Sequence, residues 1–221
     1  MALFYFVRHG ESEWNAEERL CGRTDVALSD AGRRQAARLA ERLRAPAQSG
    51  TDAIYTSPLR RTVETAEIIA AGTGLKPIVD ERLIELNYGA WEGMTFAEIM
   101  ELDGDAYRAW DADPGTVAPP DGESGEQALA RVVPFLDELA VRHPAERDHV
   151  VVVSHKTICR LIACHVLGLA PSEYRRRISM DNAALNIIQS RPERDWRLIL
   201  LNDTSHLAPI HTEAASLNGT F

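Results

Sequence analysis

Short apolar runs alternate along this chain with segments of helical periodicity. The runs at 3–7, 53–56 and 150–153 are dense in β-branched and aromatic residues. This composition is typical of strands that are buried on both faces of a parallel sheet. Two later apolar runs, at 184–188 and 196–201, indicate strands added near an edge of that sheet.

Helices are predicted between these runs from apolar spacing and from residues that favour helix starts. Apolar positions recur at helical intervals after residue 29, after residue 57 and after residue 124, and again over 156–167. The expected N-caps are Ser29, Ser57, Thr95 and Ser124. Ser57 is followed by Pro58, a residue favoured at the first helical position, and the last two N-caps fit the capping-box pattern.

Strands that alternate with helices favour a three-layer α/β/α sandwich with a mostly parallel central sheet. The whole chain, 1–221, is predicted to be one domain. Residues 83–125 interrupt the alternation with short helical segments and a Pro/Gly-rich stretch. We interpret this segment as an insertion, a partial lid over one end of the sheet. Residues 203–221 form a polar, weakly patterned tail.

Composition narrows the classes of partner. The net charge is −9, which disfavours nucleic acid and anionic membranes as partners. No stretch is long and apolar enough to span a bilayer, and the N-terminal apolar run is too short for a signal peptide. The three cysteines, Cys21, Cys159 and Cys164, match no disulfide or metal framework, and the histidines show no metal-ligand spacing. We expect a cytoplasmic protein without a metal or cofactor.

Charged side chains follow the apolar runs where each predicted strand ends. Arg8 and His9 follow the first run, His155 follows 150–153, and Arg60 lies shortly after 53–56. Ligands of open α/β sheets bind beyond the carboxyl ends of the strands. Two histidines and two arginines are therefore expected to converge at one edge of the sheet. In so acidic a chain, a phosphate site must carry its own positive charge.

These residues belong to an ordered series of short motifs. The blocks are Val-Arg-His-Gly-Glu-Ser at 7–12, Ser-Pro-Leu-Arg-Arg-Thr at 57–62, Glu-Leu-Asn-Tyr-Gly at 85–89, Gly-Glu-Ser at 122–124 and Val-Ser-His at 153–155. In this order and spacing, the chain resembles the histidine phosphatase superfamily, which is also called phosphoglycerate-mutase-like. The resemblance covers about residues 3–202.

The resemblance implies a role for each site residue. His9 would be the nucleophile that forms a phosphohistidine, which requires an unprotonated imidazole nitrogen in line with the leaving oxygen. Arg8, Arg60 and His155 would surround the phosphoryl oxygens. Arginine suits this role because it stays charged and makes bidentate contacts. No metal or cofactor takes part in the chemistry that the family implies.

Three further residues have roles by the same resemblance. Glu85 would be the general acid that protonates the leaving oxygen and then the base that activates water. Asn15 matches the family position whose side-chain amide contacts phosphate. Arg23 lies in a loop that often lines the pocket in this family. Its side chain could contact substrate or lie outside the pocket, and the sequence does not favour either alternative.

Lys156 is a departure from the family pattern. Many members have glycine directly after the second histidine, whereas this chain has Lys156 at the start of a predicted helix. We expect its side chain to point outward, although an inward position would add a cation beside the phosphate. The arginines at 175–177 are interpreted as a solvated helix face.

Three functions compete at this stage. The first is hydrolysis of a small phosphorylated metabolite, such as phosphoserine or a sugar phosphate. The second is a phosphoglycerate mutase, but the stretch 91–122 is short and acidic, with Arg108 as its only cation. The third is a non-catalytic module that binds phosphorylated ligands, against which the retained motif residues argue. A homodimer stays open as an assembly.

Overall fold

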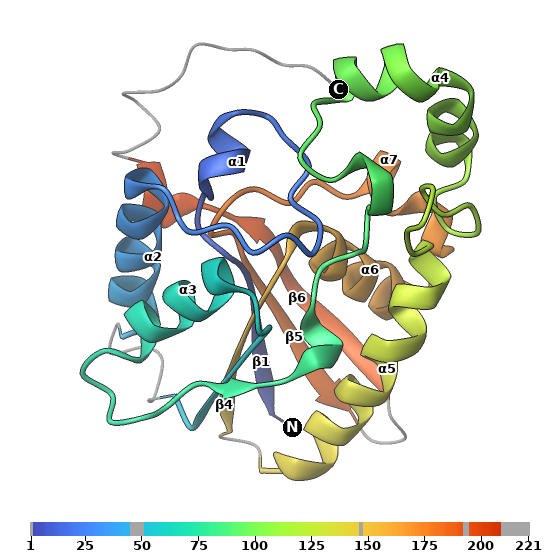
Figure 1. Ribbon diagram of the computed structural model, residues 1–221. Coiled ribbons are helices and arrows are strands. Elements are labelled where there is room, and N and C mark those ends of the chain that lie inside the picture. Colours follow the sequence, from blue (N-terminus) through green and yellow to red (C-terminus); the bar gives the residue numbers. More distant parts are fainter. Residues whose placement is uncertain (1, 45–50, 146–147, 192–194, 209–221) are drawn as a thin grey trace.

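One mixed six-stranded sheet forms the centre of the protein (Figure 1). The computed structural model describes residues 2–44, 51–145, 148–191 and 195–208. The strands are β1 (Leu3–Arg8), β2 (Ala53–Thr56), β3 (Ile78–Val79), β4 (His149–Ser154), β5 (Leu185–Arg191) and β6 (Asp195–Asp203). Their spatial order is β3-β2-β4-β1-β5-β6.

The pairing confirms a mostly parallel sheet with added antiparallel strands at one edge. Strands β1 to β4 pair in parallel, and β5 and β6 add antiparallel ladders beside β1. The three apolar runs predicted as buried strands are β1, β2 and β4, and they lie next to one another. The short, exposed strand β3 was not among the predicted strands.

The helices begin largely where the sequence predicts. They are α1 (Glu13–Ala16), α2 (Asp30–Leu43), α3 (Arg60–Ala70), α4 (Phe96–Ala112), α5 (Gly125–Arg142), α6 (Lys156–Leu167) and α7 (Tyr174–Arg177). The short 3₁₀ helices are η1 (Glu81–Leu83), η2 (Gly89–Trp91), η3 (Pro171–Glu173) and η5 (Ser205–Leu207). Ser29, Thr95 and Ser124 cap α2, α4 and α5 through their side chains, which confirms three expected N-caps.

The predicted cap at Ser57 is wrong. Helix α3 begins only at Arg60, and its N-cap position is Leu59, which has no side-chain capping bond. The Ser57 hydroxyl instead lies 2.7 Å from the Nε2 atom of His155. The Ser-Pro pair therefore forms the connection between β2 and α3 and leaves the serine side chain free for the site.

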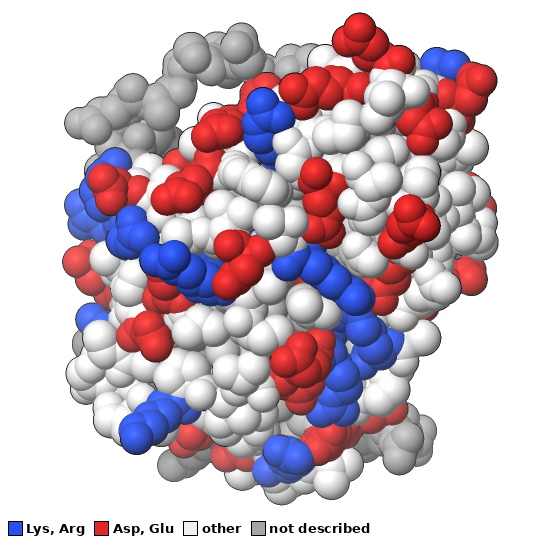
Figure 2. All heavy atoms as spheres, viewed as in Figure 1, with Lys and Arg blue, Asp and Glu red and all other residues white. Residues whose placement is uncertain are grey.

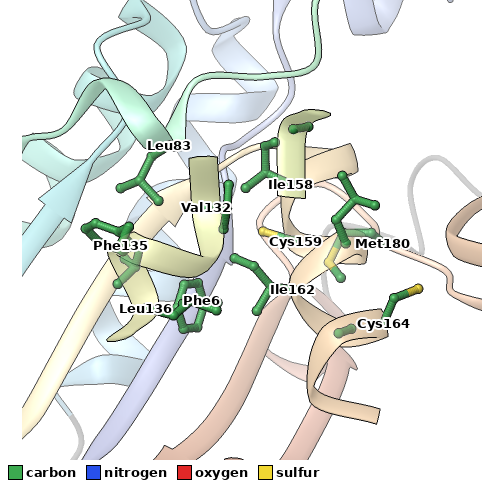
Figure 3. Packing of buried hydrophobic residues seen from close by; sticks show 14 of the residues in the cluster. Phe6, Leu83, Val132, Phe135, Leu136, Ile158, Cys159, Ile162, Cys164 and Met180 are labelled. Atoms are coloured by element: carbon green, nitrogen blue, oxygen red, sulfur yellow. The ribbon is translucent and has the colours of Figure 1, made fainter. Parts of the chain in front are cut away.

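Alternating residues of β1 divide the hydrophobic core between the two faces of the sheet. Tyr5 and Val7 belong to one cluster with α2 and α3, whereas Phe4 and Phe6 belong to the other with α5 and α6. Figure 1 shows these helix pairs on opposite sides of the strands. Figure 3 shows Phe6 packed among side chains of α5 and α6. This arrangement is the three-layer α/β/α sandwich that the sequence predicts.

The predicted insertion at 83–125 contains η2, α4 and the Pro/Gly-rich turn before α5. Helix α4 is interrupted at Asp103, whose φ of −145° and ψ of 45° are not helical. The predicted tail begins at the last residue of β6 and continues through η5, and its part at 209–221 lies outside the described residues. None of the helices in the described ranges is long and apolar enough to cross a membrane.

Parallel pairing aligns three strand ends at one edge of the sheet. Arg8 is paired with Ser154 at the ends of β1 and β4. The ladder continues one step beyond the strands, where the His9 amide donates to the Ser154 carbonyl at 3.0 Å. The Ser57 amide, just after β2, donates to the carbonyl of Val153 at 3.1 Å. The residues that follow β1, β2 and β4 are thus held side by side.

A close backbone approach fixes the loop that follows His9. A Cβ atom on Gly10 would overlap the carbonyl oxygen of Gly32, and a Cβ on Gly32 would overlap that of Glu11. The first turn of α2 therefore packs against the Gly10–Glu11 backbone with no room for a side chain. Glycine is required there because the obstructing atoms are main-chain atoms, which cannot rotate away.

We predict that Gly32→Ala lowers the free energy of unfolding by about 1–3 kcal/mol, because the added methyl group must displace backbone. Urea unfolding followed by circular dichroism measures this change. Gly104→Ala is the matched control, because its Cβ would meet only the flexible end of Arg108 within α4. Equal stability of the Gly32→Ala protein and the wild type would contradict the proposed close packing.

Candidate active site

A cavity of about 700 Å³ opens at the carboxyl ends of β1 and β4. Its walls come from the ends of these strands, from the loop at 15–22, from α3, α4, α6 and α7, and from the segment around Glu85. The wall is basic although the protein is acidic. Its basic residues are Arg8, Arg19, Arg61, Lys156, Arg160 and Arg175, and its acidic residues are Glu18 and Glu85. The cavity therefore has a positive electrostatic potential, which attracts anions.

His9 is buried at the base of this cavity with a fixed tautomer. The residue is only 3% exposed to solvent. The Nδ1 atom is 2.6 Å from the Gly10 carbonyl oxygen, so Nδ1 carries the proton and donates it. The Nε2 atom is then unprotonated, and its lone pair accepts a hydrogen bond from the Arg61 Nε–H group at 3.3 Å.

The charge state of His9 follows from the same surroundings. Burial, and then the nearby charges of Arg61 and Arg8, hold the pKa of His9 well below its ordinary value. The imidazole is therefore neutral at pH 7, with an unprotonated nitrogen available for attack.

His155 lies next to His9 but is fully buried, and it is not among the residues that line the cavity. The two rings meet edge to face with centroids 5.2 Å apart. The Ser57 hydroxyl, which accepts a bond from the Leu59 amide at 3.4 Å, can donate to His155 Nε2. The proton of a neutral His155 then sits on Nδ1, a buried atom without a hydrogen-bond partner in the described structure.

The pKa of His155 is also held well below its ordinary value, first by burial and then by Arg61 and His9. An unpaired buried polar group is costly and needs an explanation, such as a catalytic role or a bound water or ion. In this tautomer, His155 Nδ1–H is a donor beside His9 without a partner among the described residues.

Arg8 reaches the cavity from the last position of β1. One Nη atom donates to the Met180 carbonyl at 2.7 Å, while the buried Nε has no partner among the described residues. Burial lowers the pKa of Arg8 to about 10; the carboxylate of Glu85 partly offsets this effect and the charge of Arg160 adds to it. Arg8 remains a cation at pH 7, as an anion site requires.

The expected position of Arg60 beside the phosphate is wrong. Its side chain is 62% exposed and pairs with Glu64 one helical turn away, at 2.9 Å. The next residue, Arg61, is fully buried and approaches His9. Two carbonyl oxygens, those of Gly22 at 2.6 Å and Thr24 at 2.9 Å, hold its guanidinium in place. Arg61 therefore occupies the place predicted for Arg60.

Glu85 lies on the cavity wall in a fixed orientation. One carboxyl oxygen accepts the Leu86 amide at 2.8 Å, and the other accepts the Thr157 amide, in the first turn of α6, at 3.1 Å. Its own carbonyl oxygen accepts bonds from Arg23 and Arg131. These contacts hold the carboxyl group between the strand ends and α6. Glu85 as a whole is only 6% exposed.

Asn15 and Arg23 have different outcomes. Asn15 lines the cavity, where its side-chain oxygen accepts the Ser12 amide at 3.2 Å and its amide nitrogen contacts the Cys21 sulfur at 3.5 Å. Arg23 is not among the lining residues. Its side chain pairs with Glu123 at 3.2 Å and donates to the main-chain carbonyl of Glu85 at 3.4 Å. Arg23 therefore contacts the backbone of Glu85 from outside the cavity.

Lys156 is exposed, but it lies among the residues that line the cavity, so the expected position away from the pocket is wrong. Desolvation and the charges of Arg8, Arg160 and Arg175 lower its pKa to about 7. Arg175 is a second correction, because it is not part of a solvated face. It packs over the Trp110 ring at 4.1 Å and lines the same cavity.

No cluster of three or more His, Cys, Asp or Glu side chains that could hold a metal ion is present in the described parts of the chain. The outer surface has a different character from the cavity. Figure 2 shows short rows of basic side chains with acidic ones beside them, and many form ion pairs such as Arg82–Glu138 and Arg33–Glu64.

Comparison with known proteins agrees with this geometry. The profile of the Histidine phosphatase superfamily (branch 1) matches residues 4–204. The chain belongs to the histidine phosphatase superfamily. It is a phosphoric monoester hydrolase of the histidine phosphatase type.

Three relatives illustrate the range of the superfamily. Phosphoserine phosphatase 1 of Hydrogenobacter thermophilus is 38% identical over 97% of this chain and 98% of its own length. A protein named probable phosphoglycerate mutase GpmB, from Cronobacter sakazakii, is 34% identical over 94% and 95%. The solved structure of mycobacterial glucosyl-3-phosphoglycerate phosphatase Rv2419c with VO3 has a TM-score of 0.81 and 32% identity, over 90% of this chain and 98% of that one.

The sequence contains signals that could have located three residues that were not predicted near the site, namely Arg61, Ser57 and Arg160. The buried face of α3 includes Thr62, Thr65 and Ile69, and a period of 3.6 residues puts Arg60 opposite that face and Arg61 at its margin. Ser57 directly follows β2, which ends beside β4, so it could have been expected near His155. Arg160 follows Lys156 by one helical turn and shares its face.

The paired arginines of α3 provide a direct test of the site. We predict that Arg61→Gln lowers kcat/KM for p-nitrophenyl phosphate by about 100-fold or more, the usual effect of removing one donor to transition-state charge. Arg60→Gln should change it by less than about threefold, because its side chain contacts only Glu64 and solvent. Circular dichroism should verify that both variants are folded. A larger effect for Arg60→Gln would contradict the assignment.

The buried neutral histidines also predict a pH dependence of stability. Unfolding releases His9 and His155 to ordinary pKa values near 6.5, so the unfolded state binds more protons below that pH. We predict that the free energy of unfolding falls below pH 6.5, by up to about 1.4 kcal/mol per pH unit for each histidine. Urea unfolding between pH 5 and 8, in buffers without phosphate, measures the slope. The double variant His9→Gln/His155→Gln should have a shallower slope, and an equal slope would contradict the prediction.

Proposed function

We propose that this chain is a metal-independent phosphomonoesterase that hydrolyses a small phosphorylated metabolite through a phosphohistidine on His9. The observation that carries the proposal is the state of His9. Its ring is neutral, its Nδ1–H is held by the Gly10 carbonyl, and its Nε2 lies beside Arg61 at the base of a basic cavity. An oriented neutral imidazole next to bound cations is suited to attack phosphorus.

In the first step, His9 Nε2 forms a bond to phosphorus as the bond to the ester oxygen breaks. As the general acid, Glu85 gives a proton to the leaving oxygen, so an alcohol departs and Glu85 is left as a carboxylate. The negative charge on the phosphoryl oxygens is stabilised by Arg8 and Arg61, with His155 Nδ1–H and the Asn15 amide as further donors.

In the second step, water attacks the phosphohistidine. The Glu85 carboxylate removes a proton from the water as the bond between phosphorus and Nε2 breaks. Inorganic phosphate forms, and His9 regains its lone pair while Glu85 regains its proton. The Nδ1–H bond to Gly10 is needed in both steps, because it prevents the ring from presenting a protonated nitrogen to phosphorus.

The names of the relatives support a small phosphorylated metabolite as the substrate. They include a phosphoserine phosphatase and a glucosyl-3-phosphoglycerate phosphatase, the second of which was solved with VO3. Hydrolysis is favoured over phosphoryl return to a second hydroxyl by the character of the segment 91–122. Its single cation, Arg108, pairs with Asp105 and is not among the residues that line the cavity.

The phosphohistidine can be trapped with Glu85→Gln. This variant should still be phosphorylated by p-nitrophenyl phosphate, whose leaving group needs little protonation, but should lack the base for the second step. We predict that an acid-labile, alkali-stable phosphate accumulates on the peptide that contains His9, as detected by mass spectrometry. The wild type should show little of it, and turnover should fall by about 100-fold or more.

Controls separate this chemistry from alternatives. His9→Ala should abolish both turnover and labelling, whereas His165→Ala, in the last turn of α6 and away from the cavity, should retain both. Activity should persist in the presence of a chelator. Strict dependence on an added divalent metal, or isomerisation of 3-phosphoglycerate without phosphate release, would overturn the proposal.

A further inference from the structure

One wall of the cavity has more positive charge than a single phosphate needs. Lys156 and Arg160 lie one turn apart on the first part of α6, so they share a face of the helix. Arg175 of α7 lies beside them, and all three line the cavity together with Arg8. Their mutual effect is visible in Lys156, whose pKa is lowered by desolvation and by Arg8, Arg160 and Arg175.

Two of these cations have no ion-pair partner among the residues that the structure describes. Arg175 pairs with Asp111 at 3.0 Å and stacks on Trp110. Lys156 and Arg160, by contrast, form no ion pair with any carboxylate of the described chain, and the Nε of Arg160 is buried without a hydrogen-bond partner. Lys156 is exposed and Arg160 is half-buried. Neighbouring cations repel one another, and an anion that binds between them relieves this repulsion.

A buried hydroxyl group adds an independent sign of a missing ligand. Tyr174 is 1% exposed and lines the cavity, and its hydroxyl has no partner among the described residues. The neighbouring tyrosine differs, since the Tyr88 hydroxyl lies 2.9 Å from the Thr157 hydroxyl. Buried tyrosine hydroxyls usually have a hydrogen-bond partner. Tyr174 is thus a further donor on the same wall as Arg160.

The position of Glu85 tells which part of a substrate would meet this wall. The Glu85 carboxyl group accepts a hydrogen bond from the backbone amide of Thr157, the residue that directly follows Lys156 on α6. In the proposed mechanism this carboxyl group protonates the leaving oxygen, so the first turn of α6 faces the leaving group. Arg8 and Arg61 hold the other end, beside His9.

We propose that Lys156 and Arg160, together with the Tyr174 hydroxyl, form a second anion subsite, so that the preferred substrate is a phosphomonoester whose leaving group carries another anion. A carboxylate and a second phosphate share the required chemistry. This inference rests on the proposed function for its orientation, because Glu85 defines the leaving-group side. It goes beyond that function by restricting the class of substrate.

Matched substrates test the subsite. We predict that the wild type prefers 3-phosphoglycerate over glycerol 3-phosphate, which has a hydroxymethyl group in place of the carboxylate, by about 10–100-fold in kcat/KM. A second pair, propane-1,3-diol bisphosphate and propyl phosphate, measures the same preference for a second phosphate. The pair with the larger ratio identifies the anion. Ratios near one for both pairs would overturn the proposal.

Variants assign the preference to residues. Lys156→Gln and Arg160→Gln should each lower kcat/KM for the doubly anionic substrate by about tenfold or more. Each should change kcat/KM for the matched singly anionic ester by less than about threefold. Arg176→Gln is the matched control, because this arginine is 73% exposed and pairs with Glu173. Equal losses with both substrates would show a structural role and would overturn the proposal.

The ratio of the two KM values should also depend on pH. The charged groups that face Lys156 are Arg8 of β1, Arg160 of α6, Arg175 of α7 and Glu85. As Lys156 loses its proton above its pKa of about 7, the KM for the doubly anionic substrate should rise relative to its partner between pH 6.5 and 8.5. Lys156→Arg should flatten this change, because arginine stays charged. An unchanged slope in that variant would contradict the role of Lys156.

Direct binding separates this proposal from the proposed function. The His9→Ala protein, which cannot turn over, should bind 3-phosphoglycerate or the bisphosphate more tightly than the matched singly anionic ester, as measured by calorimetry. If this difference is present but no phosphohistidine forms in the wild type, the subsite stands and the proposed function fails. If phosphohistidine forms but both members of each pair bind equally, the proposed function stands and the subsite fails.

Discussion

Parallel pairing of β1 with β4 places the two histidines of the site next to each other. Arg8 is paired with Ser154, and the His9 amide extends the ladder to the Ser154 carbonyl. Because parallel strands end at the same edge, the next side chains along the two strands meet, and their rings lie 5.2 Å apart at the centroids. A slip of one residue would turn His9 to the other face of the sheet. The remaining site residues are arranged around this fixed pair.

The same burial that fixes the histidines sets their chemistry. An exposed histidine near pH 7 divides its time between charged and neutral forms, whereas burial beside Arg8 and Arg61 keeps His9 neutral. Those arginines must themselves be held in a buried place, and main-chain carbonyls do so: Met180 binds Arg8, and Gly22 and Thr24 bind Arg61. Neutral oxygens orient the cations without cancelling their charge, which stays available to a phosphate.

Much of this arrangement could be predicted from the sequence, because strong local patterns specify it. Apolar runs identified the central strands, side-chain caps identified three helix starts, and the ends of β1 and β4 located His9 and His155. The choice between Arg60 and Arg61 failed because it followed the resemblance of the motif at 57–62 and did not use the helical period. The buried positions of α3 put Arg61, and not Arg60, next to the face that packs on the sheet. The position of Lys156 could not be predicted, because α4 and α7 form part of the cavity that it lines. How these two helices pack is not visible in local sequence patterns.

In the proposed mechanism, the residues that could be predicted and those that could not lie at different ends of the site. The phosphate end is made by strand ends, whose register allows little variation, so its chemistry can be read from short motifs. The leaving-group end is made by α6, α7 and the segment around α4, whose packing depends on contacts such as that of Arg175 with Trp110. Substitutions there can change the charge of the wall without moving His9. A shared reaction with different substrates is therefore the expected outcome of this fold, and the charge of Lys156 and Arg160 is the local feature from which we infer selection by this chain.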